Sequence, residues 1–571
     1  MRNTVLLDGV WDFAFAEGMS LEEMVPGAVE LAEPMPVPCC FDASKRYFGK
    51  LGSAAYGRKV RCGGKVRLKI EALGLRGKVF WDGRKIGICE HPFSPEIFDF
   101  YAGENALHDL FIAVENIPHG PEEGKMFLLD YDFYGYGGIY DSVTLTELPE
   151  FFIDSIQTIP LDLEGNVKIR LFLGGKIPSS GYEAAISFDG KETVILHLSG
   201  ASPEFVCKVP CSRVWTMEKP FLHLLSVELE KERKLDYLET TFGIRLLEAR
   251  DQKIFLNGRA IRLVGYNRHD SCPGLGYALP AAMMVADLQA IKDQGCNFIR
   301  GCHYPQRQKF LDLCDRMGLL VWEEVIGWNN RPAQCRNADF ARFQLEQARA
   351  MVRKSANHPS VILWGFLNEV WMPEDDTPRP LIEAMVRQLK QDDPSRLVTF
   401  AFATGWMGND DCLELADVLS FNTYPGWYGW WEKPECLFSV VPKLKELADF
   451  ASCDRLKEKP LIISEIGAAA LYGFHDRYRW GEEYQEELLA AALEETFDNP
   501  RYCGIVFWHF ADAKTHIAAN TSSVLTRPRG YNNKGLLDEY RRPKQAWRRV
   551  GEILKKRGFD GYMAPPPEKK N

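Results

Sequence analysis

The sequence predicts a multidomain protein with an N-terminal β jelly roll, an immunoglobulin-like β-sandwich and a C-terminal (β/α)8 barrel of the TIM type. Short strands separated by turn residues fill the N-terminal part, which is typical of sandwiches and jelly rolls. From residue 248 onward strands alternate with helices, which is typical of a barrel. The apolar run at 361–367 is uninterrupted, as expected of a strand that is buried on both faces of a parallel sheet.

The two N-terminal units are predicted to span residues 1–149 and 150–247. In the first, Trp11-Asp-Phe-Ala-Phe15 and Val66-Arg-Leu-Lys-Ile70 alternate with period two, and Asp82-Gly83 supplies a hairpin turn. The second has regular short strands and no residue pattern that indicates chemistry, so we interpret it as a spacer.

The barrel is predicted to span residues 248–558, and residues 559–571 are predicted to form a disordered tail. A hairpin at 255–265 leads into the first barrel strand. Further strands are expected at 297–300, 319–323, 361–369, 397–400, 418–421, 460–465 and 504–508. Helices are expected at 280–294, 306–317, 338–356, 381–390 and 542–554. This alternation predicts eight βα units.

Composition excludes several classes of protein. The 571-residue chain has a formal net charge of −10 and no long basic run, which argues against nucleic acid as a partner. The sequence has no run of about eighteen apolar residues and no apolar signal-peptide core, so we expect no membrane association and a cytoplasmic location. Fifteen cysteines without a CxxC pair fit a reducing compartment. No cofactor is predicted, and the sandwiches offer surfaces for a homo-oligomer without indicating one in particular.

Two apolar strands each end in a glutamate. Residues 361–367 are followed by Asn368-Glu369, and Pro460-Leu-Ile-Ile-Ser is followed by Glu465. Chemistry in such barrels lies at the carboxyl ends of the strands. Retaining glycoside hydrolysis needs one protonated and one ionised carboxyl about 5 to 5.5 Å apart. We therefore expect Glu369 to be the acid/base and Glu465 the nucleophile; the alternative is that each merely caps a loop or binds an arginine.

Other polar and aromatic residues stand at the predicted strand ends, and their convergence favours a substrate site. Tyr424 is expected to hydrogen-bond Glu465, and Asn368 to hold a sugar 2-hydroxyl. Trp508 offers a face for a pyranose ring, although a buried tryptophan is the alternative. His269 and His303 are further candidates for substrate binding, against the alternative of satisfied core histidines. No HxxEH-type spacing appears, so no metal site is predicted and a dinuclear metal enzyme is a third-ranked alternative.

The motifs together resemble glycoside hydrolase family 2 over essentially the whole chain. They are Val79-Phe-Trp-Asp-Gly-Arg-Lys-Ile-Gly87, Gly265-Tyr-Asn-Arg-His269, Asn297-Phe-Ile-Arg-Gly-Cys-His-Tyr-Pro305, Trp364-Gly-Phe-Leu-Asn-Glu369 and Ile463-Ser-Glu-Ile-Gly467. The resemblance implies a sugar-binding jelly roll and a retaining exo-β-glycosidase, with the same roles for Glu369 and Glu465.

Within that family the chain is most similar to β-glucuronidases. The resemblance implies that Asp132, in Asp132-Phe-Tyr-Gly-Tyr-Gly-Gly-Ile139, approaches the sugar hydroxyls, and that Tyr428 lies in the tyrosine-bearing loop. Glu482-Glu-Tyr-Gln485 belongs to the nucleophile segment, and Asn532-Asn-Lys534 matches the element that binds the substrate carboxylate. A carboxylate entering a cleft flanked by two glutamates needs a cation to offset its charge. The alternative is that Lys534 belongs to a solvated basic loop.

Three departures from the glucuronidase pattern concern the identity of the sugar: Ile466, Val370-Trp371 and Pro425. They leave open a β-galacturonidase or dual uronidase, and a β-galactosidase of the same family. Arg331 is a candidate for distinguishing the C4 configuration. The alternative from another class is a non-catalytic carbohydrate-binding protein.

Overall fold

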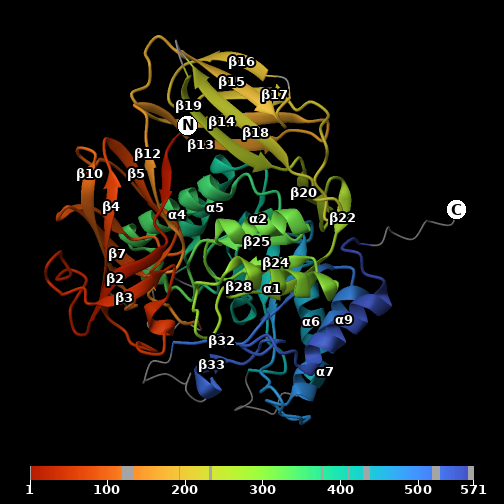
Figure 1. The fold of residues 1–571 in the computed structure, drawn as a ribbon. Coiled ribbons are helices and arrows are strands. Elements are labelled where there is room, and N and C mark those ends of the chain that lie inside the picture. Colours follow the sequence, from red (N-terminus) through yellow and green to blue (C-terminus); the bar gives the residue numbers. More distant parts are fainter. Residues whose placement is uncertain are drawn as a thin grey trace.

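The computed structural model describes residues 2–118, 133–191, 193–230, 234–373, 377–408, 411–428, 437–516 and 527–563. It has the predicted fold class: two β domains precede a barrel (Figure 1). In the described part of the chain, no helix combines the length and hydropathy that crossing a bilayer requires.

The first domain is a jelly roll with a four-stranded and a six-stranded sheet, in the orders β1-β12-β5-β9 and β3-β2-β4-β10-β7-β8. Apolar side chains from alternate strand positions, such as Phe13, Leu68 and Ile112, fill the space between the sheets. The strands are β1 (Thr4–Leu6), β2 (Gly9–Ala16), β3 (Glu33–Val37), β4 (Ser53–Cys62), β5 (Lys65–Ile70), β6 (Leu73–Gly74), β7 (Arg76–Trp81), β8 (Arg84–Cys89), β9 (Glu96–Tyr101), β10 (Ala106–Glu115), β11 (Gly138–Ile139) and β12 (Val143–Glu147).

The second domain is a seven-stranded sandwich with sheets ordered β13-β14-β17 and β16-β15-β18-β19, as in immunoglobulin-like folds. Trp215, which is fully buried, donates from Nε1 to the Asp315 carbonyl at 2.9 Å and joins this domain to the barrel. The strands are β13 (Phe151–Pro160), β14 (Asn166–Gly175), β15 (Tyr182–Phe188), β16 (Thr193–Leu198), β17 (Glu204–Lys208), β18 (His223–Glu230) and β19 (Lys234–Phe242).

The barrel is closed by eight parallel strand positions. β27 pairs with β26 and β28 pairs with β29, so the two short strands on either side of Phe400 form the fifth position. The strands are β23 (Leu263–Asn267), β24 (Phe298–Gly301), β25 (Leu320–Glu324), β26 (Val361–Gly365), β27 (Leu397–Thr399), β28 (Ala401–Ala403), β29 (Leu419–Asn422), β30 (Leu461–Ile466) and β31 (Tyr502–Phe507). All of their side chains except that of Ala403 are buried, which explains their apolar sequences.

Helices surround the barrel: α1 (Ala281–Asp293), α2 (Gln308–Met317), α3 (Pro332–Cys335), α4 (Ala338–Ser355), α5 (Arg379–Asp392), α6 (Val440–Phe450), α7 (Glu482–Asp498) and α9 (Gln545–Arg557). The prediction of eight regular βα units is wrong at the fifth. Between β28 and β29 the described residues form the 3-10 turns η3 (Thr404–Trp406) and η4 (Leu413–Leu415).

A three-stranded sheet, β20 (Leu247–Arg250), β21 (Lys253–Leu256) and β22 (Arg259–Ile261), closes the amino-terminal end of the barrel. Tyr562 forms a β-bridge with Ile261, and the Met563 amide donates to the Ala260 carbonyl at 3.0 Å. Residues 559–563, which the sequence assigns to the disordered tail, are therefore part of the fold; residues 564–571 lie outside the described residues.

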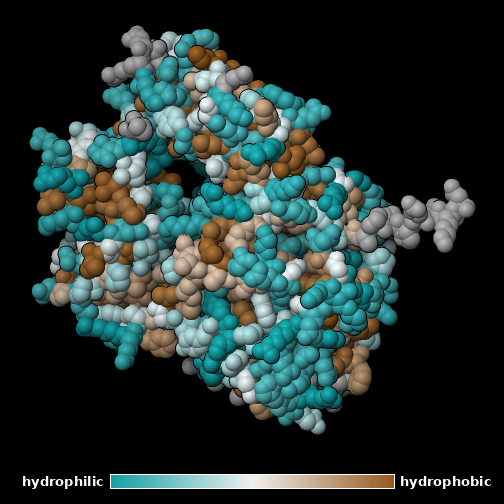
Figure 2. Space-filling view, turned by 45° about the vertical axis from the view of Figure 1, so that its right-hand side comes forward, coloured by the Kyte–Doolittle hydropathy of each residue, from teal (hydrophilic) through white to brown (hydrophobic). Residues whose placement is uncertain are grey.

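Aromatic residues join the jelly roll to the carboxyl-terminal end of the barrel. Phe93 stacks on Tyr304 with ring centroids 3.9 Å apart, and the Tyr277 hydroxyl donates to the Tyr134 carbonyl at 2.6 Å. The visible exterior is mainly hydrophilic, with apolar residues in scattered groups (Figure 2). The jelly roll thus forms one wall beside the end of the barrel where the polar residues gather.

The remaining strands, β32 (Ala513–Lys514) and β33 (Tyr531–Asn532), form a hairpin beyond β31. The Tyr134 amide donates to the Lys514 carbonyl at 2.9 Å, so the jelly roll also contacts this hairpin.

Candidate active site

The two predicted glutamates lie at the same end of the barrel. Glu465 lies within β30 and is 3% exposed. Glu369 stands four residues beyond the end of β26, where Leu367 and Glu369 both have positive φ angles, of 47° and 50°. The chain therefore leaves the strand before Glu369, and left-handed backbone aims this carboxyl, which costs local strain.

Asn422, at the end of β29, connects the two glutamates. Its Nδ2 donates to Glu369 Oε1 at 2.9 Å and to Asn368 Oδ1 at 3.0 Å. Its Oδ1 accepts from the Ser464 hydroxyl at 2.7 Å, one residue before Glu465. Sequence analysis did not identify Asn422 as a site residue, although its position directly after the expected strand at 418–421 was an available signal.

Arg300, from β24, is fully buried under the site. Its guanidinium donates to Glu465 Oε1 at 2.8 Å and to Asn368 Oδ1 at 2.7 Å. It also pairs with both oxygens of Glu324, at 3.0 and 3.1 Å. Sequence reasoning missed Arg300 and Glu324, although a charged residue at the end of the apolar run Asn297-Phe-Ile was a usable signal.

Tyr424 follows β29, and its hydroxyl donates to Glu465 Oε2 at 2.6 Å, the hydrogen bond expected from the sequence. Each oxygen of Glu465 thus accepts from a different donor, one of them cationic. Donors of this kind stabilise the ionised form of a carboxyl group.

The two carboxyls influence each other's ionisation. Burial raises the pKa of Glu465 to about 8, the charge of Glu369 adds to the rise, and Arg300 and Tyr424 lower it. The charge on one carboxyl thus opposes ionisation of the other, because like charges in a buried site repel each other.

His269, His303 and Trp508 form a buried cluster next to Glu465. His303 Nδ1 lies 2.7 Å from Glu324 Oε1, and His303 Nε2 lies 4.0 Å from Glu465 Oε1. Trp508 is 3% exposed, as Glu465 is, and its ring stacks on that of His303 with centroids 5.2 Å apart. Burial and nearby cations lower the pKa of His269 well below its usual value, which makes His269 neutral.

Asn532 ends β33 and Lys534 lies two residues further on, and both are 1% exposed. The Lys534 ammonium donates to the Tyr428 hydroxyl at 2.8 Å. It also lies 5.6 Å from the Tyr424 ring centre and 4.9 Å from that of Tyr428. The interpretation of Lys534 as part of a solvated basic loop is therefore wrong, because this lysine is buried among aromatic rings.

Arg331 stands apart from the predicted residues that gather around Glu465. Arg331 caps α3 and is exposed, with its guanidinium 4.9 Å above the ring of Trp371, two residues after Glu369. Asp132 lies outside the described residues.

A metal could find ligand atoms on His269, Cys302 and His303, which lie within 4.8 Å of one another among the described residues. Burial raises the pKa of Cys302 well above its usual value, however, and metals bind the thiolate. This donor set is therefore poorly suited to a metal.

A closed parallel barrel with two linked glutamates at the carboxyl ends of its strands is typical of glycoside hydrolases. Residues 247–554 match the family model of the glycosyl hydrolases family 2 TIM barrel domain. A solved GH2 β-galacturonidase from Eisenbergiella tayi is 30% identical, with 99% of this chain and 98% of that chain covered and a TM-score of 0.87. The chain belongs to glycosyl hydrolase family 2 and is a glycoside hydrolase.

Further comparisons agree on the family. A β-glucuronidase of Streptococcus agalactiae is 27% identical over 95% of this chain and 95% of that protein. The β-glucuronidase of Sus scrofa is 28% identical over 73% of this chain, which spans 64% of that protein.

Tyr424→Phe tests whether the Tyr424 hydroxyl lowers the pKa of Glu465. Loss of the hydroxyl removes a donor that lowers the pKa of Glu465, so this pKa rises and the acid limb of kcat/KM moves to higher pH. At pH 7 we expect a loss of about tenfold or more in kcat/KM on an aryl glycoside substrate.

Tyr502→Phe is the matched control, because it removes a buried hydroxyl that donates to the Leu444 carbonyl, away from the pair. An unchanged acid limb in Tyr424→Phe would contradict the assignment of the hydrogen bond.

Proposed function

We propose that the protein is a retaining exo-β-glycosidase that hydrolyses terminal β-D-glucuronides by double displacement. The asymmetry of the two carboxyls supports this proposal most directly. Arg300 and Tyr424 both donate to Glu465 and stabilise its ionised form, whereas Glu369 accepts from the neutral amide of Asn422. We therefore assign Glu465 as the nucleophile and Glu369 as the acid/base.

In the first step, the Glu465 carboxylate forms a bond to the anomeric carbon while the bond to the leaving oxygen breaks. Glu369 transfers its proton to that oxygen and becomes a carboxylate. In the second step, Glu369 takes a proton from water, whose oxygen displaces Glu465 from the anomeric carbon. Two inversions return the β configuration, and each glutamate regains its starting protonation state.

Buried donors around Glu465 suit the hydroxyls of the sugar. Within the described residues, Asn368 Nδ2 and His269 Nε2 are buried without a hydrogen-bond partner. Asn368 is held by Arg300 through its Oδ1, which leaves Nδ2 available for the 2-hydroxyl. We assign His303 to substrate binding through its Nε2, close to Glu465, and Trp508 to fixing the His303 ring.

Lys534, Asn532 and Tyr428 are proposed to bind the C6 carboxylate. Tyr424 connects the two parts of the site, because its hydroxyl bonds Glu465 while its ring lies beside the Lys534 ammonium. A sugar with its anomeric carbon at Glu465 could thus place its carboxylate near a buried cation, which offsets the repulsion by the two glutamates. Asp132 is proposed to contact the sugar hydroxyls.

A β-galacturonide is the second candidate substrate. The solved structure at 30% identity is named a β-galacturonidase, and a second one, also at 30% identity, is described as bound to galacturonate. The two sugars differ only at C4. Arg331 lies near the segment that carries Glu369, and we propose that it distinguishes the two configurations at C4.

A reducing, cytoplasmic location is proposed as well. Fourteen of the fifteen cysteines are described; no disulfide joins any two of these fourteen, and twelve of them are wholly or partly buried. This pattern is usual where thiols stay reduced.

The reaction itself is tested on aryl β-D-glucuronide, galacturonide, glucoside and galactoside, with the product anomer followed by proton NMR. We expect the glucuronide to be hydrolysed fastest and the β-anomer to appear first. Glu369→Ala should be rescued by azide with formation of the β-glycosyl azide, because azide replaces water but needs no base.

A first product of α configuration would rule out double displacement. No turnover of any of the four substrates would favour a carbohydrate-binding protein.

Lys534→Met tests recognition of the carboxylate. Loss of a charge-assisted contact should lower kcat/KM for the uronide by about 10- to 100-fold and leave any neutral-glycoside activity almost unchanged. Lys459→Met is the control, since this lysine precedes β30 at the opposite end of the barrel and donates to the Ala416 carbonyl. Equal losses on uronide and neutral substrates would argue against the assigned role.

Arg331→Ala tests whether Arg331 distinguishes the two configurations at C4 of the sugar. The ratio of galacturonide to glucuronide turnover should change by about tenfold, the worth of one hydrogen bond to a charged group. Arg342→Ala, on the exposed face of α4, removes an arginine paired with Glu346 and should leave the ratio unchanged. If the ratio of galacturonide to glucuronide turnover is unchanged in Arg331→Ala, this residue does not distinguish the C4 configurations.

A further inference from the structure

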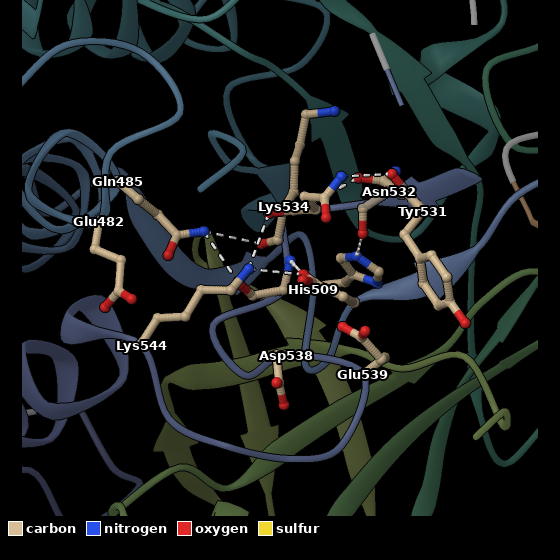
Figure 3. Close-up of polar contacts among 12 residues, drawn as sticks. Glu482, Gln485, His509, Tyr531, Asn532, Lys534, Asp538, Glu539 and Lys544 are labelled. Carbon is tan, nitrogen blue, oxygen red and sulfur yellow. Dashed lines mark hydrogen bonds and ion pairs between the residues drawn. The ribbon is translucent and has the colours of Figure 1, made fainter. Parts of the chain in front are cut away.

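The backbone that carries Asn532 and Lys534 is held by side chains far away in the sequence. His509 Nε2 lies 3.2 Å from the Asn532 carbonyl, and the His509 amide donates to the Lys534 carbonyl at 3.1 Å. In Figure 3 Lys534 extends away from the polar groups that gather around its own backbone. The segment is thus anchored on one side and presents its ammonium on the other.

Gln485, in the segment Glu482-Glu-Tyr-Gln485 at the start of α7, is the first of these anchors. It is fully buried, and its Nε2 donates to the Lys534 carbonyl at 3.3 Å, the Gly535 carbonyl at 3.1 Å and the Ala468 carbonyl at 2.8 Å. Ala468 is three residues beyond Glu465. One amide therefore ties the Lys534 segment to the segment that follows the proposed nucleophile.

A buried ion pair is the second anchor. Lys544 donates to Asp512 Oδ1 at 2.8 Å and to the Asn533 carbonyl at 3.0 Å, and both side chains are fully buried. The same Asp512 oxygen accepts from the Gly535 amide at 2.9 Å. The pair therefore bonds the backbone immediately before and after Lys534.

The ion pair is poorly explained by stability alone. Removing two charges from water costs several kcal/mol per ion, and apolar residues of similar volume are often as stabilising. Its contacts are instead directed: Lys544 bonds a carbonyl and Asp512 an amide of one short segment. Asp512 also balances the charge of Lys544 at the anchor.

We propose that Gln485, Asp512 and Lys544 are positioning residues that set the preference for a carboxylate-bearing sugar by fixing the backbone from which Lys534 extends. The inference rests on the proposed function of Lys534. A lysine ammonium lies at the end of a flexible four-carbon chain, so a small rotation of its backbone displaces it considerably. A misplacement of about 1 Å can cost about 100-fold in rate.

The test compares Gln485→Leu and the charge-neutral double variant Asp512→Asn/Lys544→Met with the wild-type enzyme. The readouts are kcat and KM on an aryl β-D-uronide, and the rise in Tm that D-glucuronate or D-galacturonate produces. We expect KM to rise about tenfold or more with a smaller change in kcat, and the uronate-induced rise in Tm to disappear.

The double variant Asp393→Asn/Arg396→Met is the matched control. It removes another buried ion pair of the barrel, with N–O distance 2.6 Å, that bonds the Val361 and His358 carbonyls at the amino-terminal end. We expect it to lower Tm while KM and the uronate effect remain unchanged. A merely structural role for Gln485, Asp512 and Lys544 would give the same result as this control.

Each outcome separates the two proposals. Wild-type enzyme that neither hydrolyses a uronide nor gains Tm with uronate overturns the proposed function, and this inference with it. Wild-type activity together with unchanged KM and an unchanged uronate effect in either folded variant overturns the positioning role alone. Gln485→Leu and Asp512→Asn/Lys544→Met remove different anchors. If only one of them folds, that variant is sufficient to test the positioning role.

Discussion

The site depends on one buried guanidinium. Arg300 contacts Glu465, Glu324, Asn368 and Asn267 from below the floor of the site. Burying a charge of this kind is costly unless partners satisfy it, and here two carboxylates and two amide oxygens do so. In return, Arg300 opposes the rise in the pKa of Glu465 that burial and Glu369 cause. Arg300 and Tyr424 together thus give Glu465 an electrostatic environment different from that of Glu369.

Charge is distributed unevenly around that floor. Arg300 and Glu324 lie beneath Glu465, whereas Lys534 lies to one side, among Tyr424 and Tyr428. Tyr424 contacts both regions, and a low local dielectric strengthens every such contact. The proposed binding of an anionic sugar is compatible with a net charge of −10, because the proposed partner of its carboxylate is a local, buried cation.

Some residues of the site lie on rigid strands, and others lie in the segments that follow the strands. Glu465 and Arg300 lie on β30 and β24, where backbone pairing limits movement. Glu369, Tyr424 and Lys534 lie just beyond strands, where the chain can adopt left-handed or irregular backbone. Such segments need anchors of their own. Asn422 supplies one for the carboxyl of Glu369, and Gln485, Asp512 and Lys544 supply them for the backbone of Lys534.

The sequence by itself determined the barrel and the position of the two glutamates at its strand ends, because both follow from local patterns. A strand buried on both faces must be apolar, and a polar residue at its end must reach the rim. Only the tertiary structure decided which residues connect those ends. Arg300 and Glu465 are 165 positions apart, and Asn422 and Glu369 are 53 apart. Residues 559–563 were misjudged for the same reason, since their contacts with β22 keep them in the fold. Burial of Lys534 likewise depends on rings brought from another loop, which no local pattern in a basic, proline-containing stretch could reveal.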